Sequence, residues 1–191
     1  STQVKVFLKV IDGLNGDVLR NAVTQPLNIT IIGNNDAPTF TRGDDIQVNE
    51  DSGAQTITEW ATNISPGQLD EIGQTLTFRL SDYDPALFSV PPAITESGDL
   101  SFTTAENANG STMLSIVLSD DGGTENDGED SSDVQTFFLT INPVNDKPSF
   151  VKGADIQVNE DSGEQFIPGW ATEIIPGAEN EADQTLTFQI S

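Results

Sequence analysis

The sequence predicts an all-β protein made of tandem β-sandwich repeats, each of about 110 residues. One long segment of sequence recurs at that interval along the chain. Apolar and polar residues alternate over short stretches, which Gly, Pro, Asn and Asp separate. No segment shows the 3.6-residue apolar period of an amphipathic helix, so we expect strands and turns without long helices.

The recurrence is visible when the chain is compared with itself. Residues 38–81 and 148–191 align without gaps, and 27 of the 44 pairs are identical. At the same offset, residues 27–38 match residues 137–148. Self-similarity at a fixed period indicates a repeat architecture, in which each unit packs mainly against its neighbours.

This alignment divides the chain into three parts. We expect the last strands of one repeat at 1–37, a complete repeat at 38–147 and the first strands of a further repeat at 148–191. The linkers at 34–38 and 144–148 are short and end in Pro, which leaves little room for free tumbling. We therefore expect a semi-rigid rod. Because the chain opens in mid-strand without signal-peptide features, we also expect an excerpt from a longer array.

Strands are expected where apolar residues occupy every second position. In the complete repeat these positions are Ile46 and Val48; Leu76, Phe78 and Leu80; Leu100 and Phe102; Leu114, Ile116 and Leu118; and Phe137, Leu139 and Ile141. Val4, Val6, Leu8 and Val10 repeat the fourth of these patterns in the first part. About seven short strands in a repeat of this length are typical of an Ig-like β-sandwich with Greek-key connections.

The chain is strongly acidic, with 31 Asp and Glu against 7 Lys and Arg and a formal charge of −24. Such a surface repels nucleic acids and anionic membranes, whereas clusters of carboxylates favour divalent cations. The sequence has no His, the commonest general base, and no Cys for disulfides. It also lacks the run of about 18 apolar residues that a membrane-spanning helix needs.

Short motifs occur in a fixed order along the repeat. Pro38-Thr39-Phe40 opens it, Glu50 ends an early strand, Asp120-Asp121-Gly122 follows a late strand, and Asn145-Asp146 precedes the next Pro-x-Phe. In this order and period, the motifs resemble those of cadherin-like repeats. The phrases VNEDSG, NANGS, DDGGT and PVNDxP are most similar to the bacterial cadherin-like repeats of large secreted or cell-surface adhesins. The resemblance covers the complete repeat and both partial ones.

The resemblance implies Ca²⁺ bound between consecutive sandwiches, where carboxylates and amide oxygens from two repeats meet. At the junction of 143–148 the implied ligands are Glu50, Asn145 and Asp146, with Glu106 as a further acid and Glu173 and Asp183 as weaker candidates. At the junction of 33–38 they are Asn35 and Asp36, joined by Asp120 or Asp121; Glu160 takes the place of Glu50 in the last part. The affinity expected of extracellular modules is on the order of 10⁻⁴ to 10⁻³ M.

The linker departs from the family pattern in one respect. The family sequence Asp-x-Asn-Asp-Asn is replaced by residues 143–147, Pro-Val-Asn-Asp-Lys, which have one acid fewer and one cation more. We therefore expect one or two ions per junction and not three.

By the same resemblance, the chain is expected to be a calcium-binding structural repeat of an extracellular or cell-surface adhesin, stiffened at its junctions, and not an enzyme. Its implied partners are the neighbouring repeats of the same chain and a cell-surface glycan or protein. Because partial repeats expose unpaired strand edges, we also expect self-association through the two ends. An acid that recurs every 110 residues is poorly placed for a single active site.

Two further patterns have competing interpretations. Trp60 and its counterpart Trp170 are candidates for stacking on sugar, which would make the chain a carbohydrate-binding module, but the favoured interpretation is a buried anchor. Arg42-Gly43-Asp44 spells the integrin-binding tripeptide. The equivalent residues 152–154 read Lys-Gly-Ala, so we interpret the tripeptide as a chance match.

Overall fold

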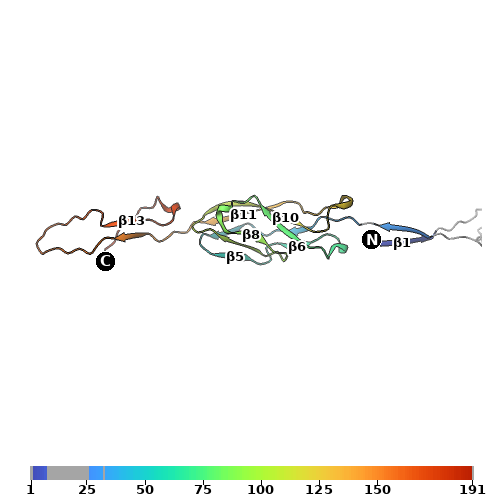
Figure 1. Ribbon diagram of the computed structural model, residues 1–191, viewed down its shortest axis with the longest axis horizontal. Coiled ribbons are helices and arrows are strands. Elements are labelled where there is room, and N and C mark those ends of the chain that lie inside the picture. The colour runs from blue at the N-terminus through green and yellow to red at the C-terminus, as the bar shows by residue number, and fades with distance from the viewer. Residues whose placement is uncertain (1, 8–25, 32, 191) are drawn as a thin grey trace, which may run out of the picture.

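The computed structural model describes residues 2–7, 26–31 and 33–190. In these residues the chain is all-β as predicted, and its only helical elements are four 3-10 turns of three residues each. The described parts follow one another along one long axis, with β1 towards one end and residues 148–190 at the other (Figure 1). No helix among the described residues is long and apolar enough to cross a membrane.

Most of the strands belong to residues 38–147, the complete repeat of the sequence alignment. They are β3 (Thr39–Thr41), β4 (Ile46–Asn49), β5 (Ala54–Ile57), β6 (Thr62–Ser65), β7 (Thr77–Ser81), β8 (Phe88–Ile94), β9 (Leu100–Thr104), β10 (Gly110–Ser119) and β11 (Gln135–Asn142). Before them come β1 (Thr2–Phe7) and β2 (Pro26–Ile31), and after them β12 (Ser149–Lys152) and β13 (Ala171–Ile175). The 3-10 turns are η1 (Leu69–Glu71), η2 (Pro85–Leu87), η3 (Glu125–Asp127) and η4 (Glu179–Glu181).

The strands of residues 38–147 form two main sheets. One has the order β4-β11-β10-β7, with β4 parallel to β11 and the other pairs antiparallel. The other has the order β5-β9-β8, and the short pair β3-β6 forms a separate ladder. The outer parts of the chain each contribute one two-stranded sheet, β1-β2 and β12-β13.

One apolar core joins both main sheets, as in a β-sandwich. The alternating positions of β9, β10 and β11 are almost completely buried: Leu100, Phe102, Leu114, Ile116, Leu118, Phe137, Leu139 and Ile141. Most of their intervening neighbours are partly or fully exposed, Phe138 to 52%, whereas Ser115 is buried. Each buried side chain of this size contributes about 1.5–3 kcal/mol of transfer free energy, so the alternation that predicted these strands also stabilises them.

Trp60 is a buried anchor, as the favoured interpretation holds. Its side chain is 6% exposed, and its ring centroid lies 4.5 Å from that of Phe137. The indole Nε1 donates to the Asp44 carbonyl at 3.0 Å, which satisfies the one polar atom of the ring. Little of the indole surface is left for a sugar to stack on.

The prediction of strands from the sequence was incomplete. Residues 38–147 contain nine strands rather than about seven, because β3, β5, β6 and β8 lack a regular apolar alternation. β8 even contains Pro91 and Pro92, but it lies at a sheet edge, and its pairing with β9 shifts register between Val90 and Ala93. An edge strand with a bulge tolerates prolines that a central strand would exclude. In the first part β1 includes Val4 and Val6, and the predicted strand residues Leu8 and Val10 lie outside the described residues.

Candidate functional site

The complete repeat holds the start of the linker at 143–148 through Glu50. This residue follows β4 and is 2% exposed. Its carboxylate accepts hydrogen bonds from the Val144 backbone nitrogen at 2.7 Å and from Asn109 Nδ2 at 3.1 Å. Its own backbone nitrogen donates to the Asn142 carbonyl at 2.9 Å. Glu50 is therefore fixed at the junction where the sequence placed it.

The part that follows holds the rest of this linker through η4. Glu181 Oε1 accepts from the Asp146 backbone nitrogen at 2.8 Å, and Gln184 Nε2 donates to Asn145 Oδ1 at 3.0 Å. The Glu181 side chain is 5% exposed. Its second oxygen, Oε2, is buried without a hydrogen-bond partner among the described residues. A buried carboxylate oxygen in this state is costly unless a cation or proton accompanies it.

Three side chains converge beside the linker. Asp51 follows Glu50, Asn107 lies in the turn between β9 and β10, and Asp146 belongs to the linker itself. With its nitrogen turned towards them, the Asn107 amide donates to Asp146 Oδ2 at 3.1 Å and to Asp51 Oδ2 at 3.2 Å. With its oxygen turned towards them instead, the amide would place a third oxygen beside the two carboxylates, and oxygens of these kinds are ligands that Ca²⁺ accepts.

The electrostatics of this junction are unfavourable for its acids. Burial raises the pKa of Asp146, and the negative charges of Glu181, Asp51 and Glu50 raise it further. A hydrogen bond from the Ala178 backbone opposes this rise in pKa without overcoming it. The docked linker therefore brings carboxylates together against their mutual repulsion.

No basic side chain in the described part of the chain neutralises this cluster. The ion pairs found there are Arg42 with Asp45 and Lys152 with Asp155, both exposed and three residues apart in sequence. Lys147, the cation within the linker, is exposed and belongs to neither pair. A divalent cation is the simplest remaining counter-charge.

The linker at 33–38 makes the same two contacts with the turn that follows it. Glu71, in η1, accepts from the Asp36 backbone nitrogen at 2.7 Å and is 7% exposed. Gln74 Nε2 donates to Asn35 Oδ1 at 2.6 Å. In both linkers, therefore, a buried Glu binds the backbone of the Asp and a Gln binds the side chain of the Asn.

The complete repeat also binds Asn35 through the loop after β10. Asn35 Nδ2 donates to Asp120 Oδ1 at 2.8 Å and to the Glu129 carbonyl at 2.6 Å. The Glu129 backbone nitrogen donates in return to the Asn35 carbonyl at 2.9 Å. Asn35 is 8% exposed, so these bonds replace water and attach the linker firmly to the repeat that follows it.

The acids Asp120 and Asp121 take different roles. Asp120 binds the linker through Oδ1, and its Oδ2 is buried without a partner in the part of the chain that the structure describes. Asp121 accepts instead from the Thr75 backbone nitrogen at 2.8 Å, and this hydrogen bond lowers the pKa of Asp121 below its usual value. Of the two alternatives that the sequence left open, Asp120 is the one in contact with the linker.

A glycine makes room for the buried Glu at each linker. A Cβ on Gly67 would collide with the Glu71 carboxylate and lie 3.2 Å from the Asp36 carbonyl. A Cβ on Gly177 would meet Glu181 in the same way. Gly67 also has a φ of +143°, which side chains other than Gly rarely allow.

The other predicted ligand residues lie apart from these contacts. Glu106, Glu160, Glu173 and Asp183 are all exposed. Beside Glu106, it is Asn107 that reaches Asp146 and Asp51. The role of each predicted residue in binding a metal stays a prediction.

Sequence reasoning missed the residues that clamp the linkers, Glu71 with Gln74 and Glu181 with Gln184. A signal was present, because both positions are identical between the two aligned segments. The weaker candidates lacked it: Asp183 aligns with a Gly, and Glu173 aligns with an Asn. Identity between the internal copies would have selected the clamp residues.

The donors at the junction are mixed in type. Within the described residues, no group of three or more Asp or Glu side chains has an arrangement that could hold a metal ion by itself. A site at Asp51, Asn107 and Asp146 would therefore combine two carboxylates with an amide oxygen, and would need further carbonyl or water oxygens. Ca²⁺ accepts such a set, because it takes 6–8 oxygens in flexible geometry.

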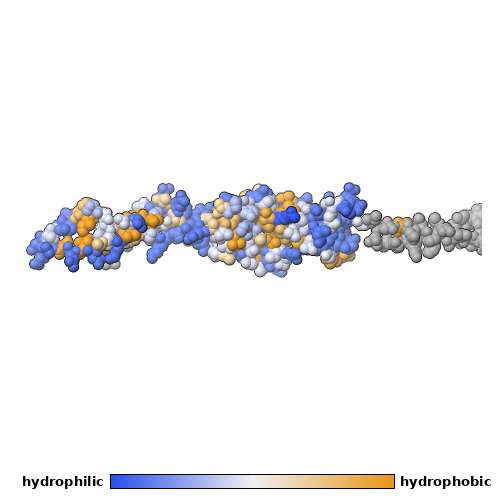
Figure 2. Space-filling view, in the orientation of Figure 1, coloured by the Kyte–Doolittle hydropathy of each residue, from blue (hydrophilic) through white to orange (hydrophobic). Residues whose placement is uncertain are grey.

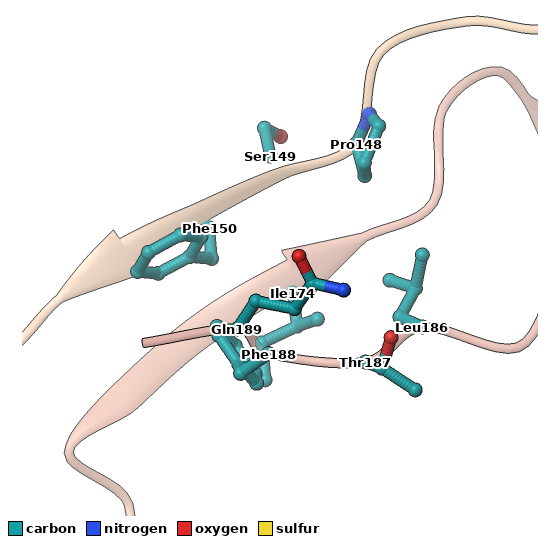
Figure 3. A pocket seen from close by; sticks show the side chains of 8 residues that line it. All are labelled: Pro148, Ser149, Phe150, Ile174, Leu186, Thr187, Phe188 and Gln189. Carbon is teal, nitrogen blue, oxygen red and sulfur yellow. The ribbon is translucent and has the colours of Figure 1, made fainter. Parts of the chain in front are cut away.

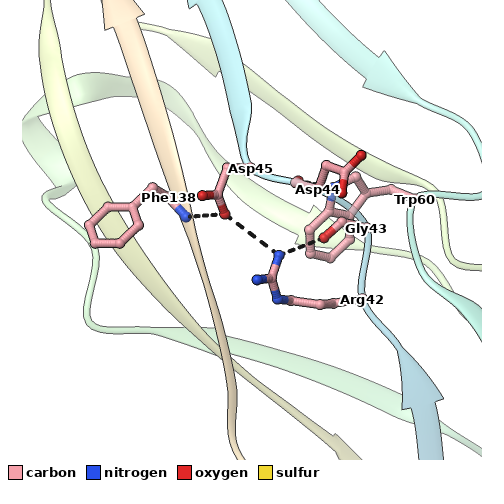
Figure 4. Close-up of polar contacts among 6 residues, drawn as sticks. All are labelled: Arg42, Gly43, Asp44, Asp45, Trp60 and Phe138. Atoms are coloured by element: carbon pink, nitrogen blue, oxygen red, sulfur yellow. Dashed lines mark hydrogen bonds and ion pairs between the residues drawn. The ribbon is translucent and has the colours of Figure 1, made fainter.

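The tripeptide at residues 42–44 is part of the packing around Trp60 (Figure 4). Arg42 Nη1 donates to the Gly43 carbonyl at 2.7 Å and lies 3.5 Å from Asp45 Oδ1. A Cβ on Gly43 would lie 2.6 Å from the Trp60 ring. These contacts give the three residues a structural role and support the interpretation of a chance match.

Comparison with known proteins adds no family to these observations. No protein-family model matches the sequence, and a search of curated proteins finds no match.

Proposed function

We propose that this chain is a calcium-binding structural segment of an extracellular adhesin, made of tandem cadherin-like sandwich repeats of Ig-like, Greek-key type. Ca²⁺ between consecutive repeats would stiffen an extended stalk that supports adhesion to a cell or surface. The observation that carries this proposal is the junction at 143–148. There Asp51, Asn107 and Asp146 converge, and Glu181, which binds the Asp146 backbone through one oxygen, has a second oxygen that is buried without a partner among the described residues.

The donor chemistry supports calcium in particular. All the candidate ligands are oxygens, and the sequence has no His or Cys for a softer transition metal. The donors come from both sides of the junction, Asp51 and Asn107 from the complete repeat and Glu181 from the part that follows. An ion bound to both sides restricts their relative rotation, which is the mechanical role that we propose.

The hydrogen bonds of the linker differ between the repeat that follows it and the repeat that precedes it. The following repeat binds the Asn and the Asp of the linker without any ion, through its buried Glu and its Gln. The preceding repeat reaches the Asp side chain only where carboxylates crowd together. On the preceding side of the linker at 143–148, calcium would add to the hydrogen bond between Glu50 and the Val144 backbone, whereas the following side is held without an ion.

A carbohydrate-binding module is the alternative function, and no observation favours it. Its main candidate residue, Trp60, lies in the core with its indole nitrogen already bonded to the Asp44 carbonyl. Catalysis is not part of the proposal, because the acids at the two linkers serve as hydrogen-bond acceptors for the chain itself.

Calcium titration of the whole chain by isothermal calorimetry tests the proposal. We expect binding with a dissociation constant on the order of 10⁻⁴ to 10⁻³ M. Asp146→Asn removes one charged ligand and should weaken the junction site by about tenfold or more, which corresponds to about 1.4 kcal/mol. Glu96→Gln is the matched control, because it removes the same charge from an exposed turn between β8 and β9. Equal affinities in the two variants would contradict a site at Asp146.

A further inference from the structure

The exposed apolar side chains of this chain are of two kinds, which the internal repeat distinguishes. Phe150 and Phe188 are half-exposed and stack edge-to-face, with ring centroids 5.0 Å apart, beside a hollow of about 240 Å³ (Figure 3). Their counterparts Phe40 and Phe78 make the same contact at 5.1 Å within the core of the complete repeat. Phe150 and Phe188 therefore occupy core positions of the repeat, and their exposure does not mark a docking surface.

Met113 and Phe138 are of the other kind. They pair across β10 and β11 on the outward side of the four-stranded sheet, where they are 42% and 52% exposed. At the offset of 110 residues, Asn28 on β2 takes the place of Phe138, and Asn28 pairs with Lys5 on β1. The sheet thus accepts a polar pair at this place. Single exposed apolar residues are normal, but an adjacent pair that the fold does not require indicates a contact with a partner.

This pair lies on the flank of the complete repeat, between its two linkers. β10 begins beside Asn109, which binds Glu50 at the linker at 143–148. It ends before Asp120, which binds Asn35 in the linker at 33–38. The outward face of the sheet therefore extends from one junction towards the other, and the described parts before and after the repeat leave it exposed.

Acids are absent from this face. None of the residues in strands β3 to β11 is Asp or Glu, although the chain contains 31 of them. In Figure 2 the most hydrophilic residues of the complete repeat gather mainly towards its two ends. Asp45, which accepts from the Phe138 backbone nitrogen at 3.1 Å, is paired with Arg42 (Figure 4). A second copy with its charge of −24 is therefore repelled by the loops but not by this face.

Arg79 adds an attraction for an acidic partner. It lies on β7 opposite Val117 of β10, on the same outward face as Met113, and it is exposed. It belongs to neither of the two ion pairs found among the described residues. A partner that matches this face combines an apolar patch with a net negative charge, and a second copy of this chain has both.

We propose that two copies of this chain bind each other side by side through the outward face of the sheet β4-β11-β10-β7, with Met113 and Phe138 at the centre of the contact. Each copy presents the same patch, so the contact is two-fold and closes at a dimer. Four strands about 4.8 Å apart cover roughly 300 Å² over about five residues each, whereas a stable interface buries about 800 Å² per partner. We therefore expect a weak dimer. The contact needs no calcium and stands independently of the function proposed above.

Sedimentation equilibrium in chelator, at physiological salt and up to millimolar protein, tests the proposal. The native chain should approach twice its mass of 20.4 kDa and not exceed that value. Met113→Lys combined with Phe138→Asn introduces the residue types that β1 and β2 carry in their Lys5–Asn28 pair, so the variant should fold with native strand content. Its association constant should fall at least tenfold, because the apolar centre of the contact is lost.

The double variant gains one positive charge, so added repulsion between acidic copies does not explain weaker association. Val90→Lys is the matched control, because it makes the same change of charge at a position on β8 that is 54% exposed. This control should dimerise like the native chain.

Three results would overturn the proposal. One is a native chain that stays monomeric throughout this range of concentration. A second is a double variant that associates as strongly as the native chain, which would assign the contact to another surface, such as the apolar residues of 148–190. The third is a Val90→Lys control that loses association to the same extent as the double variant.

Discussion

At the scale of single residues, Asp146 has opposing interactions at its backbone and its side chain. Its backbone nitrogen is bound by Glu181, which holds the residue in place. Its carboxylate is held among the charges of Glu181, Asp51 and Glu50, and these charges raise its pKa after burial has already done so. Such a carboxylate binds either a proton or a cation more readily than a free one does.

This raised pKa gives a pH dependence with a defined sign. In chelator, the folded state binds a proton at Asp146 more tightly than the unfolded state does, so stability should increase as pH falls from about 7 through the raised pKa towards 3.8. Asp121 behaves in the opposite way. Because its pKa is lowered in the folded state, its charged carboxylate stabilises the fold above pH 3.8, and this stabilisation is lost as pH falls below 3.8. Calcium affinity should decrease over the same window in which Asp146 takes up its proton.

Thermal melting in chelator across this pH range, with Asp146→Asn as the reference, measures the effect. The native chain should be less stable than the variant near neutral pH, and the difference should shrink as the solution is acidified. A difference that is independent of pH would show that Asp146 does not experience the charges around it.

The sequence could predict part of this site and not the rest. Glu50, Asn145 and Asp146 were found from motifs, because linker residues are adjacent in sequence and stand beside a Pro. Glu181 was missed because it reaches the linker from a turn 35 residues away, a contact that only folding creates. Asn107 was missed because its neighbour Glu106 is the acid, whereas the turn brings the amide to the linker.

At the scale of elements, the turns η1 and η4 are the parts that clamp the linkers. Each is a single 3-10 turn that carries its buried Glu as third residue, with the Gln three positions later. Glu71 also accepts from the Gln68 backbone nitrogen at 2.7 Å, so one carboxylate both caps its own turn and binds the linker. The turn and the linker therefore depend on each other.

Gly67→Ala tests that dependence. The added Cβ would collide with the Glu71 carboxylate at a backbone φ of +143°, so we expect a loss of about 1–3 kcal/mol in the free energy of unfolding. Gly73→Ala is the control, because a Cβ there meets nothing within 4 Å, and its effect should stay within about 1 kcal/mol. Urea unfolding of both variants measures this, and equal stabilities would contradict the role assigned to Gly67.

The strands show the same limit of sequence reasoning. Central strands β9, β10 and β11 were predicted because each buries one face, which imposes a period of two on their residues. The edge strand β8 was not predicted. An edge strand with a bulge tolerates Pro91 and Pro92, so its residues do not alternate regularly between apolar and polar. All-β architecture followed from composition and alternation, whereas the order of strands in each sheet came only from the structure.

At the scale of the whole molecule, the described parts form an elongated chain of units (Figure 1). Each linker belongs mechanically to the repeat that follows it, because buried side chains of that repeat bind its Asn and Asp. Towards the preceding repeat, the linker at 143–148 is bound by Glu50 at the Val144 backbone, and Asp51 and Asn107 meet the Asp146 side chain. We propose that calcium binds there and stiffens the chain into a rod.

Small-angle X-ray scattering of the whole chain tests this central claim most directly. It should be recorded in chelator and in millimolar calcium, at concentrations where the scattering mass is that of one chain. We predict a longer maximum dimension and a narrower distribution of lengths in calcium, and no such change in Asp146→Asn. Identical scattering profiles of the native chain in the two conditions would contradict the account.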